Sequence, residues 1–245
     1  TALYGSEKGF AFKRQNDEEG LSGIEAVLKR LDELEGDFRV RLSSLEPNVV
    51  DKEHVERIVK YKRLCRHLHL SIQSGSNNVL KGMKRRYTRD EYLAIVEAIR
   101  SVDPLYGITT DIIVGFPGET KEDFADTLDV VDKAFFGRVH AFKFSPRQGT
   151  EAAKYKETVT PADKTARVNE LINRAEHVAQ EFQKRNFNTV HRVLVETFEE
   201  DYATGYTSNY IKVYIKDKER KLVSGEFVEV RLVANYKEGC LAEVV

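Results

Sequence analysis

The residues best placed to do chemistry stand at the ends of four strand-like runs. Each run begins with apolar or β-branched residues and closes in Ser, Gln, Gly, Pro or a charged residue; the runs are Arg39–Pro47, His67–Asn77, Ile108–Thr120 and Arg138–Thr150. Helical patterns follow three of them directly and the fourth after a short loop. Repeated strand–helix units predict an α/β fold with a parallel sheet, and in such folds the carboxyl ends of the strands form the working face. The polar residues at those ends are therefore the first candidates for ligand binding.

The first two runs end in side chains that suit the recognition of a polar small molecule. Ser43, Ser44 and Glu46 close the first run, and Gln73 lies near the end of the second. Ser74 and Ser76 follow Gln73, but capping of the next helix is the interpretation that we favour for these two serines.

The third run contains the sharpest local motif, GFPGET, at Gly115–Thr120. Gly115 and Gly118 permit tight backbone geometry and close approach of a ligand. Phe116 and Pro117 lie between them, and Glu119 stands at a predicted helix N-terminus, where backbone N–H groups can bind ligand oxygens. A plain strand-to-helix turn with a good cap explains the motif equally well.

Asp111 is an acidic residue inside the otherwise apolar third run. Burial of an unpaired carboxylate is costly, so we expect Asp111 to face the mouth of the fold or a partner. A structural salt bridge is the alternative. His67 and His69 alternate with leucines and share one face of their strand, but no third ligand is evident beside them, so no metal site is predicted.

A basic segment follows the second run. Lys81–Arg89 contains five cations, among them Arg85 and Arg86, and could bind a phosphate backbone. A solvated charged surface is the simpler interpretation of such a run.

Composition narrows the class of protein. The 245 residues are 41% apolar and carry a net charge of −1, which fits a sizeable core with a highly charged surface. There is no long apolar run of the kind that spans a membrane and no visible signal peptide. The two cysteines, Cys65 and Cys240, are too few for a disulfide framework, and a reducing cytoplasm is the simple interpretation.

Helical periodicity and capping residues predict the elements that would position these groups. The predicted helices cover Leu21–Leu34, Asp51–Tyr61 with Asp51 as N-cap, Asn77–Met83, the segment from the cap Thr88 to Val102, Lys121–Phe135 with Thr120 as cap, and Pro161–Arg185. The first five residues, Thr1–Gly5, resemble the tail of a strand. The polar segment that follows, Ser6–Gly20, is predicted to be a loop. We therefore expect a piece of a longer protein.

From Phe187 onward the spacing of apolar residues changes from helical to alternating. Four short strand-like segments punctuated by glycines predict a small closed β-barrel. Tyr206, Asn209, Tyr210 and Lys212 could stack bases and hold phosphates there. Yet residues 187–245 hold 8 Lys and Arg against 10 Asp and Glu, a net of −2, which argues against strong nonspecific binding of nucleic acid. The predicted division is residues 1–160, a partial (βα) barrel; 161–186, a connecting helix; and 187–245, the small barrel.

Taken together, RLSSLEP, HLHLSIQSGSNNVLKGMKRRYT, TDIIVGFPGET and FSPRQGT resemble, in this order and spacing, the radical-SAM methylthiotransferases. The segments VLVE, TGYTSNYIKV and VEVRLV resemble the TRAM domain that ends those enzymes. RLSSLEP with HLHLSIQSGSN favours the branch that modifies threonylcarbamoyladenosine beside the tRNA anticodon. The resemblance covers nearly all of the chain.

The resemblance implies a partial radical-SAM barrel of TIM type, S-adenosylmethionine, two 4Fe–4S clusters, tRNA as partner and an electron donor such as flavodoxin. This chain departs from the family because Cys65 and Cys240 belong to no cluster motif, so we expect it to be inactive alone. The residues that the resemblance implies for binding S-adenosylmethionine are Ser43, Ser44, Glu46, Gln73, Asp111, the Gly115–Glu119 loop (Gly115, Phe116, Pro117, Gly118, Glu119), Phe144 and Ser145. The residues that it implies for binding RNA are Arg85, Arg86, Tyr206, Asn209, Tyr210 and Lys212.

Three alternatives stay open. The isopentenyl-adenosine branch and the branch that modifies ribosomal protein S12 are near relatives of the favoured branch. A noncatalytic RNA-binding scaffold, which would use the barrel and the TRAM domain without cluster chemistry, belongs to a different class of function.

Overall fold

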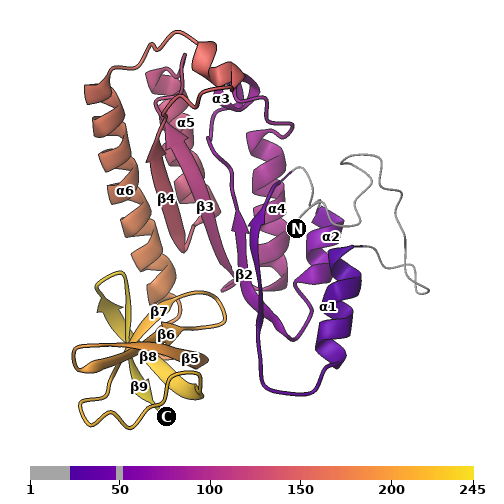
Figure 1. The fold of residues 1–245 in the computed structure, drawn as a ribbon, viewed down its shortest axis with the longest axis vertical. Helices are drawn as coiled ribbons and strands as arrows, with labels where there is room; N and C mark the ends of the chain where they lie inside the picture. Colours follow the sequence, from indigo (N-terminus) through magenta and orange to yellow (C-terminus); the bar gives the residue numbers. More distant parts are fainter. Residues whose placement is uncertain (1–22, 48–51) are drawn as a thin grey trace.

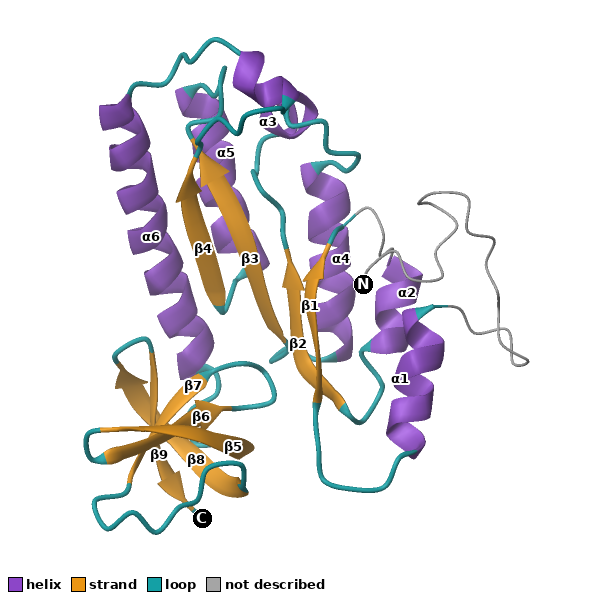
Figure 2. Ribbon diagram, in the orientation of Figure 1, coloured by secondary structure: helices purple, strands orange, loops and turns teal. Residues whose placement is uncertain are grey.

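A four-stranded parallel sheet forms the first half of the protein. The computed structural model describes residues 23–47 and 52–245. The strands lie in the order β1-β2-β3-β4, and each neighbouring pair is parallel. Their bounds are β1 Val40–Leu45, β2 Leu64–Leu70, β3 Gly107–Val114 and β4 Arg138–Lys143. Figure 2 shows the four strands pointing away from the small β-barrel, so their carboxyl ends form the far edge of the sheet.

Helices pack against one face of this sheet (Figure 1), and the apolar side chains between them form the core. The helices are α1 Ile24–Glu33, α2 Lys52–Ile58, α3 Asn77–Gly82, α4 Arg89–Val102, α5 Lys121–Ala134 and α6 Pro161–Lys184, with a short 3₁₀ helix, η1, at Glu151–Lys154. Alternation along β3 sends Ile108 and Ile112 into the core beneath the helices. The opposite face carries Asp111, which is only partly buried.

Local capping sets where the helices begin. Thr88 and Thr120 each form a complete capping box with the third helical residue, Glu91 and Asp123 respectively. Ser76 caps α3, as predicted, whereas Ser74 accepts a hydrogen bond from the backbone N of Ser76 instead of capping the helix. These contacts are local in sequence, which is why the pattern of residues predicts them.

The last part of the chain forms a closed five-stranded barrel in the order β5-β6-β7-β9-β8. Its strands are β5 Val190–Glu199, β6 Tyr202–Tyr206, β7 Lys212–Lys216, β8 Phe227–Tyr236 and β9 Gly239–Val244. The second of the four predicted segments contains two strands, β6 and β7, because the turn at residues 207–211 interrupts it. The predicted closure into a small barrel is confirmed.

The helix α6 joins the two sheets and also packs along β4 and α5 (Figure 1). At the junction the two parts touch closely: a Cβ on Gly107, at the start of β3, would lie 2.1 Å from the carbonyl O of Asn209. Arg39 adds a hydrogen bond of 3.3 Å to the carbonyl O of Tyr206. The small barrel therefore lies against the amino ends of the parallel strands.

Most predicted elements are found in the structure, with ends shifted by a few residues. The predicted strand tail at Thr1–Gly5, the loop Ser6–Gly20 and the N-cap Asp51 lie outside the described residues. Within residues 23–47 and 52–245, no helix combines the length and the apolar character needed to cross a membrane.

Candidate functional site

The carboxyl edge of the sheet presents polar side chains from the first two strands. Ser43 and Ser44 of β1 are exposed there, and Ser44 has a φ of 54°. Gln73 follows β2 with a φ of 68°, and its backbone N donates to the carbonyl O of Asp111 at 2.9 Å. Within the described ranges, the side chains of Ser43, Ser44 and Gln73 make no hydrogen bond to the protein. Their hydroxyl and amide groups are thus available to a ligand.

Glu46 and Arg85, predicted for the cofactor and the RNA respectively, are partners in this structure. Arg85 Nη1 lies 3.3 Å from Glu46 Oε1, and the Nε of Arg85 is buried without a partner. The neighbouring Arg86 is exposed and forms no ion pair with any described residue. Of the two arginines, Arg86 is therefore the more available to a phosphate group.

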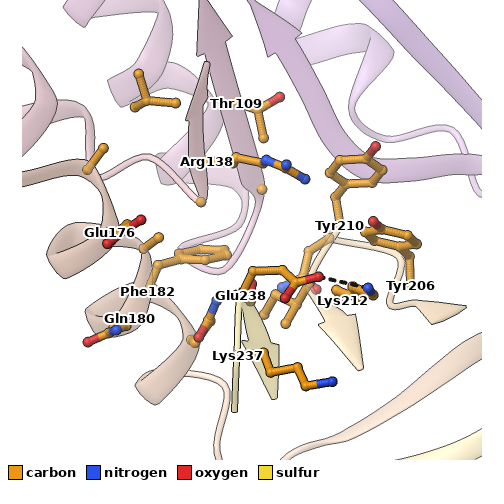
Figure 3. Close-up of a pocket in the computed structure, with 18 of the residues that line it drawn as sticks. Thr109, Arg138, Glu176, Gln180, Phe182, Tyr206, Tyr210, Lys212, Lys237 and Glu238 are labelled. Carbon is orange, nitrogen blue, oxygen red and sulfur yellow. Dashed lines mark hydrogen bonds and ion pairs between the residues drawn. The ribbon is translucent and has the colours of Figure 1, made fainter. Parts of the chain in front are cut away.

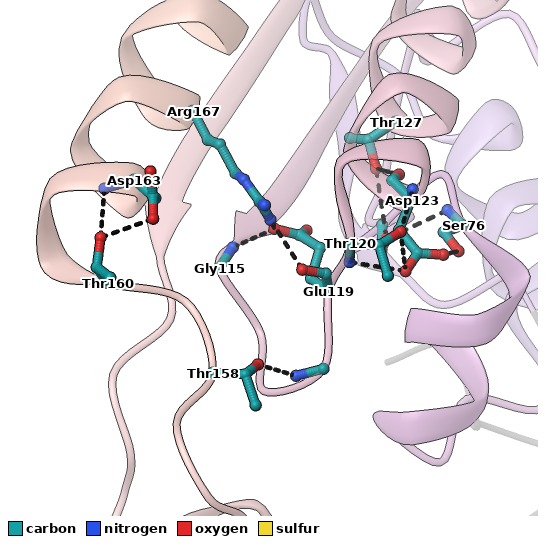
Figure 4. Close-up of polar contacts among 12 residues, drawn as sticks. Ser76, Gly115, Glu119, Thr120, Asp123, Thr127, Thr158, Thr160, Asp163 and Arg167 are labelled. Carbon is teal, nitrogen blue, oxygen red and sulfur yellow. Dashed lines mark hydrogen bonds and ion pairs between the residues drawn. The ribbon is translucent and has the colours of Figure 1, made fainter.

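The Gly115–Glu119 loop follows β3 and is fixed by its own backbone contacts (Figure 4). The backbone N of Gly115 donates to Glu119 Oε2 at 2.7 Å, and that of Gly118 donates to Thr158 Oγ1 at 2.7 Å. Gly115 has a φ of 75°, and a Cβ there would lie 2.4 Å from Cγ of Lys164. Glycine suits this position because it tolerates the positive φ and leaves room for the Lys164 side chain, which any other residue would displace.

The carboxylate of Glu119 points into the protein. It forms an ion pair with Arg167 of α6, and its side chain is completely buried (Figure 4). Burial raises the pKa of Glu119, although the hydrogen bond from Gly115 and the charge of Arg167 act in the opposite direction. Its Oε1 has no partner among the described residues. In this structure Glu119 positions the loop, and its direct contact with a ligand remains a prediction.

Aromatic rings join this loop to the end of β4. The rings of Phe116 and Phe144 meet edge to face with centroids 5.1 Å apart, and Tyr155 packs on Phe116 at 6.0 Å. The backbone N of Phe144 donates to the carbonyl O of Val114 at 2.8 Å. Pro117 is half-buried and Ser145 is exposed beside them. The structure thus brings Phe116 and Phe144 together at one edge, whereas it does not bring them into contact with Ser43.

Asp111 lies three residues before the end of β3, below this edge. Its Oδ2 is 3.0 Å from His69 Nε2 and accepts a hydrogen bond of 2.8 Å from Ser71 Oγ. His140 of β4 is its direct strand neighbour. His140 was not predicted as a site residue, yet the alternation of Arg138, His140 and Phe142 along β4 is the same signal that predicts His67 and His69 to share one face.

Two of the residues predicted for RNA are part of the contact between the small barrel and the sheet. Asn209 is buried, and its Nδ2 donates to the carbonyl O of Leu105 and to Asn186 Oδ1, both at 2.9 Å. Tyr210 stacks between Tyr206, at 4.7 Å, and His67, at 4.3 Å. These side chains attach the barrel to the sheet, and contacts with RNA remain a prediction.

A cavity of about 380 Å³ opens beside this contact, between α6, the starts of β3 and β4, and the small barrel (Figure 3). Lys212 lines it and pairs with Glu199 and Glu238 at 2.7 Å each. Partial burial lowers the pKa of Lys212, but the hydrogen bonds to the two glutamates outweigh it and raise the pKa overall. Lys212 is therefore charged, but its charge is already neutralised by neighbours.

Comparisons with known proteins agree with this architecture. Residues 15–131 match the Radical SAM superfamily. The E. coli coproporphyrinogen III oxidase HemN, described as a radical SAM enzyme, superposes with a TM-score of 0.52 over 83% of this chain and 53% of its own, at 17% identity. That similarity concerns the fold alone.

Several curated relatives match over most of this chain, among them two that are named for different tRNA nucleosides. The threonylcarbamoyladenosine tRNA methylthiotransferase MtaB of Thermotoga maritima is 41% identical over 227 residues, which is 91% of this chain and 52% of MtaB. The tRNA-2-methylthio-N(6)-dimethylallyladenosine synthase of Natranaerobius thermophilus is 38% identical over 222 residues, 89% of this chain and 49% of the relative. The chain thus spans about half the length of the curated relatives it matches.

Proposed function

Because this chain belongs to the radical-SAM methylthiotransferase family, we propose that the full-length protein adds a methylthio group to C2 of N6-threonylcarbamoyladenosine next to the anticodon of tRNA. The observation that carries the proposal is the 41% identity to a protein named for that substrate, over 91% of this chain. The motif RLSSLEP together with HLHLSIQSGSN supports the same branch.

The carboxyl edge of the sheet fits S-adenosylmethionine. Ser43, Ser44 and Gln73 offer hydroxyl and amide groups that would bind its polar groups, together with Glu46. The Gly115–Glu119 loop, Phe144 with Ser145, and Asp111 would complete the surface that holds it. When bound, S-adenosylmethionine supplies the radical-generating group and the methyl group; the described residues bind and orient it.

The described residues do not fit an iron–sulfur cluster. Such clusters need several thiolates, and the chain has only Cys65 and Cys240. Cys65 lies on β2, whereas Cys240 is buried in the core of the small barrel. Burial raises the pKa of both thiols, that of Cys240 to about 12. We propose that residues beyond these 245 hold two 4Fe–4S clusters, reduced by a donor such as flavodoxin, and that these 245 residues alone are inactive.

The RNA side of the proposal rests on two surfaces. Arg86 is exposed beside the pair of Arg85 and Glu46, and the small barrel, which we identify with a TRAM domain, presents Tyr206 beside the buried Asn209, Tyr210 and Lys212. We propose a division into residues 1–160, 161–186 and 187–245, in which α6 connects the parallel sheet to the small barrel. Since tRNA is the proposed substrate, we also propose a cytoplasmic location.

A second candidate is the dimethylallyladenosine branch, supported by the 38% identity to a synthase of that class. The test is to incubate the full-length protein, reconstituted without oxygen with iron and sulfide, with S-adenosylmethionine, a reductant and, in separate reactions, tRNA that carries one or the other nucleoside or ribosomal protein S12, whose mass is measured as well. Nucleosides are then analysed by mass spectrometry. We expect a methylthio mass increase on threonylcarbamoyladenosine. An increase only on the dimethylallyl nucleoside or on ribosomal protein S12 would contradict the branch, and no product on any of the three would favour a noncatalytic RNA-binding scaffold.

A further inference from the structure

Three metal-ligating side chains converge on the open face of the parallel sheet. His69, Asp111 and His140 come from the adjacent strands β2, β3 and β4. Asp111 is paired directly with His140, and Thr109, two residues before Asp111, is paired with His69. Because side chains alternate along a strand, this register sends all three to the same face. One ligand atom from each lies within 4.8 Å of the other two.

Neighbouring groups hold two of these side chains in place. His69 Nδ1 lies 2.9 Å from Thr109 Oγ1, and Ser71 Oγ donates to Asp111 Oδ2 at 2.8 Å. In the tautomer in which His69 donates from Nδ1, the lone pair of Nε2 faces the Asp111 oxygen at 3.0 Å. That lone pair is then available to a metal ion; in the other tautomer Nε2 donates a proton to Asp111 instead, and Ser71 Oγ lies 3.0 Å from the same nitrogen. Partners that fix the ring in this way are typical of histidines that bind metals.

His140 completes the set. Its ring lies 5.9 Å from that of His69, between centroids, and neither of its nitrogens makes a hydrogen bond to a described residue. The side chains of His69 and Asp111 are 12% and 29% exposed, so an ion has access from solvent. A ring nitrogen of His140 is thus available as the third metal ligand.

We propose that His69, Asp111 and His140 bind one divalent transition-metal ion of the zinc, iron or cobalt class. Two imidazoles with one carboxylate suit these borderline ions, whereas calcium and magnesium prefer oxygen ligands alone. Metal–ligand bonds of about 2.0–2.2 Å fit the present spacing of His69 Nε2 and Asp111 Oδ2, which are 3.0 Å apart, and binding would adjust the position of the His140 ring. Three protein ligands leave coordination positions for water or for another small ligand. The site is distinct from any iron–sulfur cluster, because no cysteine takes part, and it does not depend on the proposed function.

The test is a titration of the untagged, metal-free 245-residue chain with Co²⁺, followed by visible absorption and by elemental analysis after gel filtration. We expect one ion per chain, ligand-field bands without a sulfur-to-cobalt charge-transfer band, and displacement by Zn²⁺. His140→Ala should weaken binding by more than about 100-fold, and Thr109→Val, which frees the His69 ring, by about 10- to 100-fold. His177→Ala, an exposed histidine on α6, should bind as the parent does.

Circular dichroism checks the fold of each variant, and His140→Gln serves if His140→Ala does not fold. Absence of stoichiometric binding to the parent chain would overturn the proposal, and a proton shared by His69 and Asp111 would then explain their contact. Parent-like affinity in both His140→Ala and Asp111→Asn would also overturn it. A strong sulfur charge-transfer band would do the same, because it would assign the ion to Cys65 or Cys240.

Discussion

Replacement of Arg167 by Met should strongly destabilise the protein. The Glu119 side chain is 0% exposed and that of Arg167 is 13% exposed, so Arg167→Met leaves a buried carboxylate with only the backbone N of Gly115 as partner. Removal of one member of a buried ion pair costs about 3–5 kcal/mol, and we expect a loss near about 3 kcal/mol because Arg167 keeps some contact with water. The assay is urea unfolding of the 245-residue chain followed by circular dichroism.

The same helix offers a matched control. Arg174 pairs with Asp132 at the surface, where both side chains are more than 40% exposed, so Arg174→Met should cost less than about 1 kcal/mol. Adding Glu119→Gln to Arg167→Met should restore part of the lost stability, because a neutral amide replaces the buried charge. An equal cost for the two arginine variants, or no recovery in the double variant, would refute the reasoning.

The pH dependence of Arg167→Met follows from the direction of the pKa shift. Burial raises the pKa of Glu119 above its ordinary value of 4.5. A carboxyl group with a raised pKa in the folded state binds more protons when folded, so its contribution is most favourable at low pH and is lost as the pH rises through the folded pKa. The stability deficit of Arg167→Met should therefore be larger at about pH 8 than at about pH 5. A deficit that grows on acidification would contradict this sign.

Two further changes test the junction and the RNA surface. Gly107→Ala puts a Cβ 2.1 Å from the carbonyl O of Asn209 and should lower the free energy of unfolding by about 1–3 kcal/mol, whereas Gly137→Ala, whose Cβ would meet its nearest neighbour at 3.4 Å, should cost less in the same urea assay. Arg86→Ala should weaken binding of tRNA to the full-length protein and lower the slope of log affinity against log salt by about 1, while Arg30→Ala on α1 leaves both unchanged. Equal effects of the two glycine changes would contradict the close contact at the junction. Equal effects of the two arginine changes would contradict the assignment of Arg86 to the RNA surface.

The sequence predicts the features of this fold that depend on near neighbours. Thr88 with Glu91, and Thr120 with Asp123, are three residues apart, so the residue types alone indicate the capping boxes that the structure contains. Alternation and glycines likewise predict the small barrel. The turn that splits β6 from β7 was not predicted, because the polar residues from Thr207 to Tyr210 continue the alternating pattern across it.

Contacts between distant segments could not be predicted in this way. From the sequence, Glu119 resembles an exposed residue at a helix N-terminus. Only the packing of α6 against the loop shows that it forms an ion pair with Arg167, 48 residues later. Asn209 looks like a surface residue of a turn until the barrel docks on β3. His140 joins His69 only because β3 and β4 are neighbours in register. These partners depend on the order of strands and on helix docking, which the pattern of a single segment does not contain.

The most direct test of the proposed site is the affinity of the reconstituted full-length protein for S-adenosylmethionine, measured by equilibrium dialysis on the parent, on Gln73→Ala and on Gln180→Ala. Gln73 stands at the carboxyl edge of the sheet, whereas Gln180 lies on α6 beside the cavity at the opposite end. Loss of a hydrogen bond to a charged ligand costs about 1.5–3 kcal/mol, so Gln73→Ala should bind at least about tenfold more weakly. Gln180→Ala should match the parent. Unchanged affinity in Gln73→Ala, or an equal loss in Gln180→Ala, would contradict the placement of S-adenosylmethionine at the carboxyl edge.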